Sequence, residues 1–130
     1  MNKIVPLFLR ISIAFGFLSA VADRFGLWSE ANSTWGNWQH FLAYTGTINP
    51  WFPAVAIPVI GVLATGLEVV LAVWLLTGFK TSLAAKMAGV LLLIFALSMT
   101  FSSGIKGAFD YSVFIASAGA FALATLTEKK

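Results

Sequence analysis

Four apolar stretches constrain this chain more than any other feature, because a helix needs about 20 such residues to cross the hydrocarbon core of a bilayer. The qualifying ranges are 4–22, 54–77, 82–101 and 108–126. They cover 82 of the 130 residues, and the one long connection between them is 23–53. The sequence therefore predicts one domain, 1–130, folded as an all-α integral membrane bundle of four transmembrane helices.

The composition supports lipid as the solvent for this chain. Apolar residues make up 59% of the sequence and charged residues only 10%, whereas soluble domains carry about 25% charged residues. The net charge of +3 comes from basic residues that are scattered singly, so no basic face for nucleic acid is expected.

The residue counts exclude several kinds of redox centre and metal site. The chain has no cysteine, which excludes disulfides, iron–sulfur clusters and zinc–thiolate sites. His40 is the only histidine, so no metal site of clustered imidazoles is expected either. Any redox role would need a diffusible carrier or a partner subunit, and no residue is assigned to catalysis.

The basic residues predict an orientation, because cytoplasmic ends of membrane helices are rich in lysine and arginine. With the N-terminus in the cytoplasm, the inner side carries Lys3, Arg10, Lys80, Lys86, Lys129 and Lys130. Arg24 and Lys106 are left on the outer side. Both termini are therefore expected in the cytoplasm.

The first stretch has an alternative interpretation as a cleaved signal peptide. A basic start, a short apolar run and the small residues Ala20 and Ala22 fit that pattern, with a mature chain starting at Asp23. Arg10 interrupts the apolar run and favours a retained helix. Both interpretations stay open at the level of sequence.

The long connection over residues 23–53 holds four of the five tryptophans, Trp28, Trp35, Trp38 and Trp51. Tryptophan collects where lipid meets water, so the segment is expected to lie on the outer surface as an interfacial anchor. The alternative is a lid over a cavity between the helices.

The same connection contains a short amphipathic pattern. Ser33 or Thr34 is a candidate helix cap, and the helix would run to about Thr45. Trp38, Phe41 and Leu42 would then lie on one face. Beyond it, Pro58 opens the second apolar stretch, where it would act as a hinge or as a packing feature.

Small residues at four-residue spacing favour close helix packing in lipid. They occur in the last three stretches, as Gly61 and Thr65, as Ala85 and Gly89, and as Ser112, Ala116, Ala120 and Ala124. The spacing does not distinguish contacts within one chain from those of a homo-oligomer.

Glu68 is the charged residue that most needs a partner, because its short side chain lies near the middle of the second stretch. Arg10 in the first stretch is offset from it by roughly 5 Å along the helix axes, within reach of an arginine. We expect a polar core pair of Arg10 and Glu68. Its role is either a structural clamp or a site for a proton, a cation or a polar head group. Lys86, near a helix end, is expected to extend to the membrane surface.

A second set of charges is expected at the outer side, where the third stretch leads into the fourth. It joins the end of the first stretch to the start of the last, with these members: Asp23, Arg24, Lys106, Asp110 and Tyr111. The set would either exchange contacts in water or form a polar pocket under the tryptophan-rich loop.

Three segments carry a family resemblance. They are the arginine-led 10–18 (RISIAFGFL), the glutamate helix and its exit at 67–81 (LEVVLAVWLLTGFKT) followed by Ala84 and Ala85, and GIKG at 104–107 with DYS at 110–112. In these segments, and over nearly all its length, the chain resembles the DoxX family of small bacterial membrane proteins. The first loop is longer and more aromatic than in the family core.

The DoxX resemblance implies four helices in the bacterial inner membrane and an association with membrane oxidoreductases. Related proteins include the quinone-reducing type of subunit, so an accessory or quinone-interacting subunit, with a redox partner subunit and quinone as its cofactor, is the leading hypothesis. A quinone suits an apolar crevice with a few donors such as Arg10, Tyr111 or Trp38. The alternatives are a small proton-coupled exporter that uses Glu68, and a scaffold that binds no ligand.

Overall fold

The computed structural model describes residues 3–128, which form helices joined by turns and loops, with no strand among them. The α-helices are α1 (Ile4–Arg24), α2 (Trp38–Ile48), α3 (Ile57–Thr77), α4 (Thr81–Ser102), α5 (Ile105–Asp110) and α6 (Val113–Leu126). Two 3-10 helices, η1 (Glu30–Asn32) and η2 (Ala54–Ala56), lie in the connections before α2 and α3. The all-helical prediction is confirmed for the described residues.

Three segments are long and apolar enough to cross a membrane: Ile4–Arg24, Ala54–Thr77 and Thr81–Ser102. They confirm the helices predicted over 4–22, 54–77 and 82–101. Pro58 is the second residue of α3, where a backbone N–H has no partner within the helix. The proline therefore starts the helix and does not act as a hinge within it.

The continuous helix predicted over 108–126 is wrong in its first part. α5 ends at Asp110 and α6 begins only at Val113, after Ser112 takes up a left-handed backbone conformation with φ of 56°. An L-residue in that conformation interrupts a right-handed helix. The 14 residues of α6 span about 21 Å, so this helix is shorter than the other three long ones.

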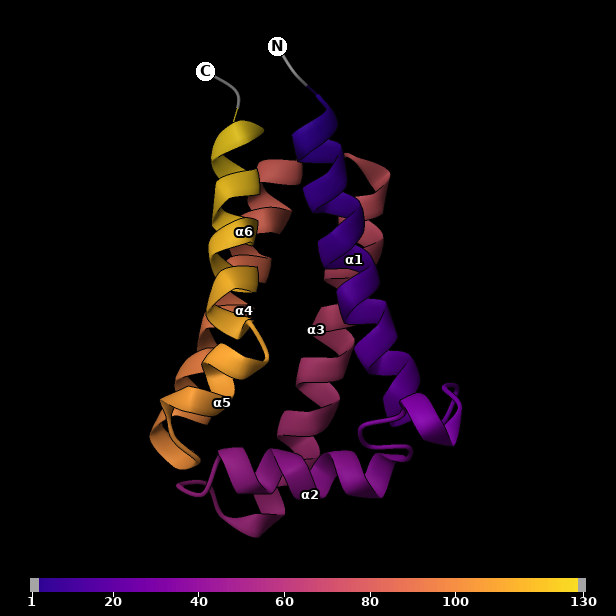
Figure 1. The fold of residues 1–130 in the computed structure, drawn as a ribbon, viewed down its shortest axis with the longest axis vertical. Coiled ribbons are helices and arrows are strands. Elements are labelled where there is room, and N and C mark those ends of the chain that lie inside the picture. Colours follow the sequence, from indigo (N-terminus) through magenta and orange to yellow (C-terminus); the bar gives the residue numbers. More distant parts are fainter. Residues whose placement is uncertain (1–2, 129–130) are drawn as a thin grey trace.

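The long helices pack most closely as two pairs, α1 with α3 and α4 with α6 (Figure 1). The pairs meet along α3 and α4, which are joined by a tight turn, and also where α1 contacts α6. They diverge toward the end where α2 lies. The start of α1 and the end of α6 lie together at the opposite end. Lys129 and Lys130, which were among the basic residues used to predict the membrane orientation, lie outside the described residues.

The turn between α3 and α4 depends on Gly78. Its φ of 74° is left-handed and ends α3 at Thr77, a conformation that glycine adopts without the steric cost of a Cβ. Trp74 on the last turn of α3 donates from Nε1 to the carbonyl oxygen of Phe79 at 2.7 Å and holds the turn against the helix end.

Close packing of α4 on α6 uses the predicted small residues. A Cβ added to Gly89 would lie 2.9 Å from the ring of Phe121, so only glycine lets this ring lie on α4. Ser117 donates from Oγ to the carbonyl oxygen of Gly89 at 2.8 Å. Ala120 and Ala124 are buried in the same contact.

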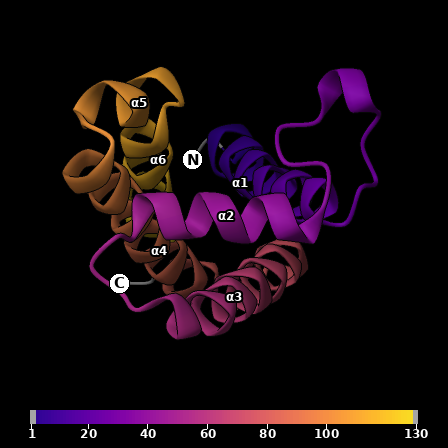
Figure 2. The ribbon, with the colours of Figure 1, turned by 90° about the horizontal axis from the view of Figure 1, so that it is seen from below.

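α2 crosses the end of the bundle where the helix pairs diverge (Figure 2). Its cap is Asn37, whose side chain accepts a hydrogen bond from the amide of His40 at 2.8 Å, so the predicted cap at Ser33 or Thr34 is wrong. The predicted face is correct. Trp38, Phe41 and Leu42 all lie over Gly61 of α3, within 4 Å of where a Cβ would be.

Many large apolar side chains lie exposed on the outside of the long helices, among them Phe8 and Phe15 of α1, Val70 of α3 and Ile94 of α4. Such a surface on three long helices is typical of a protein whose solvent is lipid.

Candidate functional site: a cavity closed by the second helix

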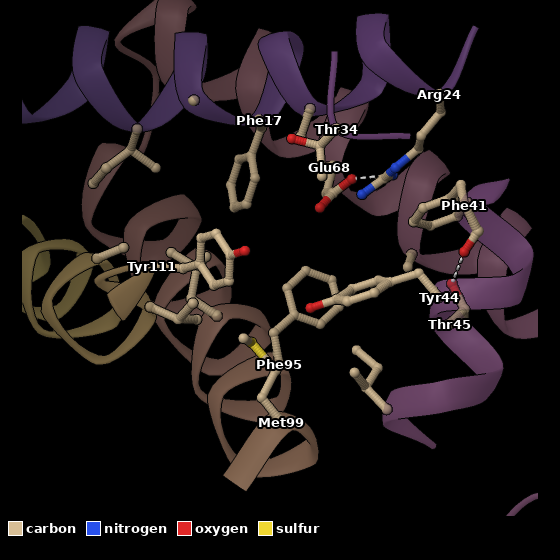
Figure 3. A pocket seen from close by; sticks show the side chains of 18 of the residues that line it. Phe17, Arg24, Thr34, Phe41, Tyr44, Thr45, Glu68, Phe95, Met99 and Tyr111 are labelled. Atoms are coloured by element: carbon tan, nitrogen blue, oxygen red, sulfur yellow. Dashed lines mark hydrogen bonds and ion pairs between the residues drawn. The ribbon is translucent and has the colours of Figure 1, made fainter. Parts of the chain in front are cut away.

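A cavity of about 630 Å³ lies between the two helix pairs. Its walls come from α1, α3, α4 and α6, and α2 covers the end of the cavity where the helix pairs diverge (Figure 3). Most of the lining is apolar, with Phe17, Phe95 and Met99 around the centre. Polar atoms enter at a few points only, which is the usual make-up of a small-molecule site.

A buried ion pair forms part of the cavity wall. Arg24, the last residue of α1, donates from Nη1 to Glu68 Oε2 on α3 and to Thr65 Oγ1 at 2.8 Å. Both charged side chains are 3% exposed. A carboxylate at the middle of a long apolar helix is costly without a partner, and Arg24 meets that requirement.

Aromatic rings complete the surroundings of Arg24. Its guanidinium carbon lies 3.9 Å from the ring centroid of Phe41 on α2 and 5.2 Å from that of Trp35. Cation–π contacts of this kind are strongest where water is excluded. The guanidinium thus joins α1, α2 and α3 at one point, and it faces the cavity beside Glu68 (Figure 3).

The predicted pair of Arg10 and Glu68 is wrong. Arg10 donates from Nε to the carbonyl oxygen of Leu75 at 2.9 Å and from Nη2 to that of Leu76 at 3.2 Å. These carbonyls belong to the last turn of α3, where no further amide of the helix follows and a cation is favoured. Arg10 therefore caps α3, about 10 Å further along that helix than Glu68.

Asp23, next to Arg24, holds the tryptophan-rich loop. Its carboxylate accepts hydrogen bonds from the hydroxyl of Ser33 and from the amides of Thr34 at 2.8 Å, Trp35 at 3.0 Å and Gly36 at 3.3 Å. Three successive amides and a hydroxyl satisfy a carboxylate that is only 6% exposed. This clasp brings Trp35 over Arg24.

The predicted outer cluster is not a single group, because its members divide into separate sets. Asp23 and Arg24 are buried and have the partners just described. Lys106 pairs with Asp110 at 2.7 Å within α5, with side chains 86% and 55% exposed. Tyr111 belongs to the cavity. The ion pair on α5 is an ordinary exposed i, i+4 contact.

Two tyrosines extend into the cavity from opposite sides, Tyr44 from α2 and Tyr111 from the turn between α5 and α6 (Figure 3). Neither hydroxyl has a hydrogen bond to residues 3–128. Burial raises the pKa of Tyr44 above its ordinary value of 10.0, and the nearby Tyr111 adds to the rise. The hydroxyl of Tyr44 is therefore a neutral donor at neutral pH.

The carboxylate of Glu68 keeps one oxygen for the cavity. Arg24 occupies Oε2, whereas Oε1 accepts no hydrogen bond from the described part of the chain and points toward the space between the tyrosines (Figure 3). The site therefore presents one strong acceptor and two hydroxyl donors at the edge of an apolar cavity.

The four loop tryptophans have different positions. Trp35 lines the cavity, and Trp38 stacks on Phe25 with ring centroids 5.7 Å apart. Trp28 donates from Nε1 to the carbonyl oxygen of Ser19 at 3.1 Å, and Trp51 is 51% exposed. The loop and α2 form a cover over the cavity through Trp35, while Trp28 and Trp51 remain available at the surface.

Lys86 lies 3.8 Å from Glu128, with more than half of both side chains exposed, and its extension to a membrane surface stays a prediction. Sequence reasoning missed the role of Arg24 and that of Tyr44. An arginine directly after an acid, where an apolar stretch meets an aromatic loop, was the available signal for Arg24. No pattern in α2 distinguished Tyr44 from its aromatic neighbours.

Comparisons of this chain with family models, with curated proteins and with solved structures found no match. The resemblance to the DoxX family therefore rests on the sequence motifs alone.

Proposed function

We propose that this chain is a DoxX-type integral membrane protein that holds a quinone in the cavity, as an accessory subunit of a membrane oxidoreductase. The observation that carries the proposal is the free oxygen of Glu68, which faces the hydroxyls of Tyr44 and Tyr111 in an otherwise apolar cavity. The family resemblance suggests the association with an oxidoreductase, and the arrangement of polar groups in the cavity suggests a quinone as the ligand.

The proposed membrane arrangement has four crossings. α1, α3 and α4 supply three of them, and α6 with α5 at its entrance supplies the fourth. An even number of crossings accords with the two described chain ends lying at one end of the molecule (Figure 1). With the basic side inward, that end faces the cytoplasm of a bacterium and α2 lies at the outer surface of its inner membrane. Labelling of cysteines introduced at Lys3 and in α2, from either side of sealed vesicles, tests this arrangement.

A quinone fits the polar atoms of the cavity in both of its redox states. The oxidised ring has two carbonyl acceptors, which the hydroxyls of Tyr44 and Tyr111 are able to satisfy. The reduced ring has hydroxyl donors, for which Glu68 Oε1 is the acceptor. The volume of about 630 Å³ lies within the range of small-molecule sites, roughly 300–1,000 Å³.

The charge arrangement favours a neutral ligand over a cationic one. A proton-coupled exporter of cations needs a carboxylate that is free to exchange its proton for the substrate, but Glu68 is already paired with Arg24, which Thr65 Oγ1 helps to hold. A scaffold with no ligand would have no need of a cavity of this size. The ion pair therefore weighs against the exporter, and the cavity weighs against the scaffold.

Quinone binding is tested by quenching of tryptophan fluorescence in nanodiscs with a benzoquinone that carries a decyl tail. We expect saturable quenching, because Trp35 lines the cavity. The double variant Tyr44→Phe with Tyr111→Phe should weaken binding by about tenfold, the value of one or two hydrogen bonds. Lys106→Gln, which alters only the exposed pair on α5, is the control. Absence of saturable binding to the wild-type protein would overturn the proposal.

The proposed partner subunit is tested separately. Cross-linking in membranes followed by mass spectrometry should identify a redox protein bound to this chain. Recovery of cross-links only between copies of this chain would contradict the accessory role and identify a homo-oligomer.

A further inference from the structure

The cavity is open on one side only. Its exposed lining residues are Ser12 and Gly16 of α1, Thr34 of the adjoining loop, Tyr111 before α6 and Ile115 of α6. Every lining residue from α2, α3 and α4 is buried or half-buried. The opening therefore lies between α1 and α6, and the other walls are closed.

The side chains at this opening leave space. A Cβ added to Gly16 would meet nothing within 4 Å, whereas one added to Gly119 on the facing helix would be in van der Waals contact with Leu9 of α1, at 3.7 Å. The space therefore lies at Gly16, and the two helices touch nearer the start of α1. Tyr111 and Ile115 are 73% and 71% exposed although both line the cavity. α1 packs more closely on α3 than on α6.

The opening lies along the middle part of α1. Gly16 is eight residues before the end of α1 at Arg24, about 12 Å along the axis, and twelve residues, about 18 Å, from the start at Ile4. Phe15, next to Gly16 in the sequence, is 56% exposed on the outside of α1. On the proposed four-crossing arrangement, the opening faces the hydrocarbon core of the bilayer.

α2 covers the end of the cavity nearest to water, where Thr34 of the adjoining loop is the one exposed lining residue among those described. Phe41, Thr45 and Ile48 of α2 are buried and line that end, and the clasp on Asp23 holds the adjoining loop. A ligand that came from water would have to displace this cover, whereas one dissolved in the bilayer passes only the gap at Gly16.

We infer that the cavity takes its ligand sideways from the bilayer, through the gap between α1 and α6, and that the ligand carries a long apolar tail. The head lies against Glu68 and Tyr111, and the tail passes Gly16 and Ile115 into lipid. The inference rests on the proposed function in that a ligand binds the cavity, and it adds the class of that ligand and its route.

A bulky group installed at the gap after folding tests this route. The chain contains no cysteine, so Gly16→Cys provides one reaction site for N-(1-pyrenyl)maleimide on protein that is already folded. Gly66→Cys is the matched control, because Gly66 is also an exposed glycine of a long helix with nothing near its absent Cβ, but it does not line the cavity.

Two probes with one head group separate the route from the binding itself. They are a benzoquinone with a decyl tail and the same ring without a tail. The binding of each probe is measured by competition, so that the fluorescence of the pyrene label does not affect the measurement. Labelling at position 16 should weaken binding of the tailed probe by about tenfold or more and change that of the tail-less ring by about twofold or less. Labelling at position 66 should change neither.

The other outcomes overturn the inference at identifiable points. If labelling at position 16 leaves both probes unaffected, the tail does not pass between α1 and α6, and the proposed function still stands. If both probes weaken equally, the gap does not distinguish a tail and the ligand class is wrong. If neither probe binds the unlabelled variants or the wild type, the proposed function fails, and this inference fails with it.

Discussion

Arg24, the last residue of α1, forms a buried ion pair with Glu68 near the middle of α3. The pair ties two helices that are distant in sequence and sets the polar edge of the cavity. Thr65 and the rings of Phe41 and Trp35 complete the surroundings of the guanidinium. Both side chains are only 3% exposed, so the pair has almost no contact with solvent.

Removing one partner of the pair should be far more damaging than removing both. Arg24→Met leaves Glu68 buried without its cation, and we expect a loss of about 3–5 kcal/mol in the free energy of unfolding. The double variant Arg24→Met with Glu68→Met should recover most of that loss. Unfolding in mixed detergent micelles measures all the variants, and additive losses in the double variant would contradict the prediction.

Asp23→Asn should release the tryptophan-rich loop while leaving the helices folded. The neutral amide accepts hydrogen bonds from Thr34, Trp35 and Gly36 less strongly than the carboxylate does, and each charge-assisted bond is worth about 1.5–3 kcal/mol. Hydrogen exchange should therefore quicken at these amides. Glu30→Gln, a change at an exposed acid in the same loop, is the control and should leave the exchange rates unchanged.

Arg10→Gln should lower stability without altering the cavity. Arg10 caps the carbonyls of Leu75 and Leu76, a contact worth about 1–3 kcal/mol for a partly buried cation at a helix end. Binding of the decyl-tailed benzoquinone should change by about twofold or less, since Arg10 does not line the cavity. A binding loss like that of Arg24→Met, measured on folded protein, would restore Arg10 to the site.

Gly89→Leu should separate α4 from α6, because the ring of Phe121 already occupies the space that a Cβ would need. Forcing bulk into a packed contact costs about 1–3 kcal/mol, and the hydrogen bond from Ser117 to the carbonyl of Gly89 would be strained as well. Gly66→Leu places the same side chain on an exposed helix face and should be neutral or stabilising. The unfolding free energies of the two variants provide the comparison.

The alkaline titration of Tyr44 should reflect its burial. Because folding raises the pKa of Tyr44 above 10.0, the folded state holds this proton more tightly than the unfolded state. The stabilisation is fully present below pH 10 and is lost as pH rises through the pKa of Tyr44 in the folded protein. Tyr44→Phe should remove this part of the alkaline loss of stability.

The titration is directly observable because the chain has only two tyrosines. In Tyr111→Phe the tyrosinate absorbance comes from Tyr44 alone, and its midpoint should lie above 10 but below the value that Tyr44 has beside Tyr111. A midpoint at or below the ordinary value would show that the hydroxyl is in water.

Much of the helical arrangement was predictable from local pattern. The apolar stretches set the long helices to within a few residues, since a continuous run of apolar side chains reveals its length directly. The break before α6 was missed because Tyr111 and Ser112 are not polar enough, compared with their apolar neighbours, to interrupt such a run. The interruption comes from the left-handed backbone at Ser112, which composition does not encode.

The candidate site was predictable only in part. Glu68 was identified because a mid-helix carboxylate is costly in any apolar setting. Its partner was assigned wrongly, because Arg10 and Arg24 lie on the same helix and the assignment assumed parallel helix axes with matched ends. Packing places Arg10 on the last turn of α3 and leaves Arg24 to reach inward.

The sequence by itself determined that this chain forms long apolar helices, that a carboxylate lies near the middle of one of them, and that an aromatic segment follows the first. Only the tertiary structure decided which cation pairs with the carboxylate, which tyrosines face it and where the cavity opens. The physical reason is that hydropathy is summed along a helix, whereas ion pairs and cavities depend on how far the helices are offset and tilted, which the packing of all their side chains sets together.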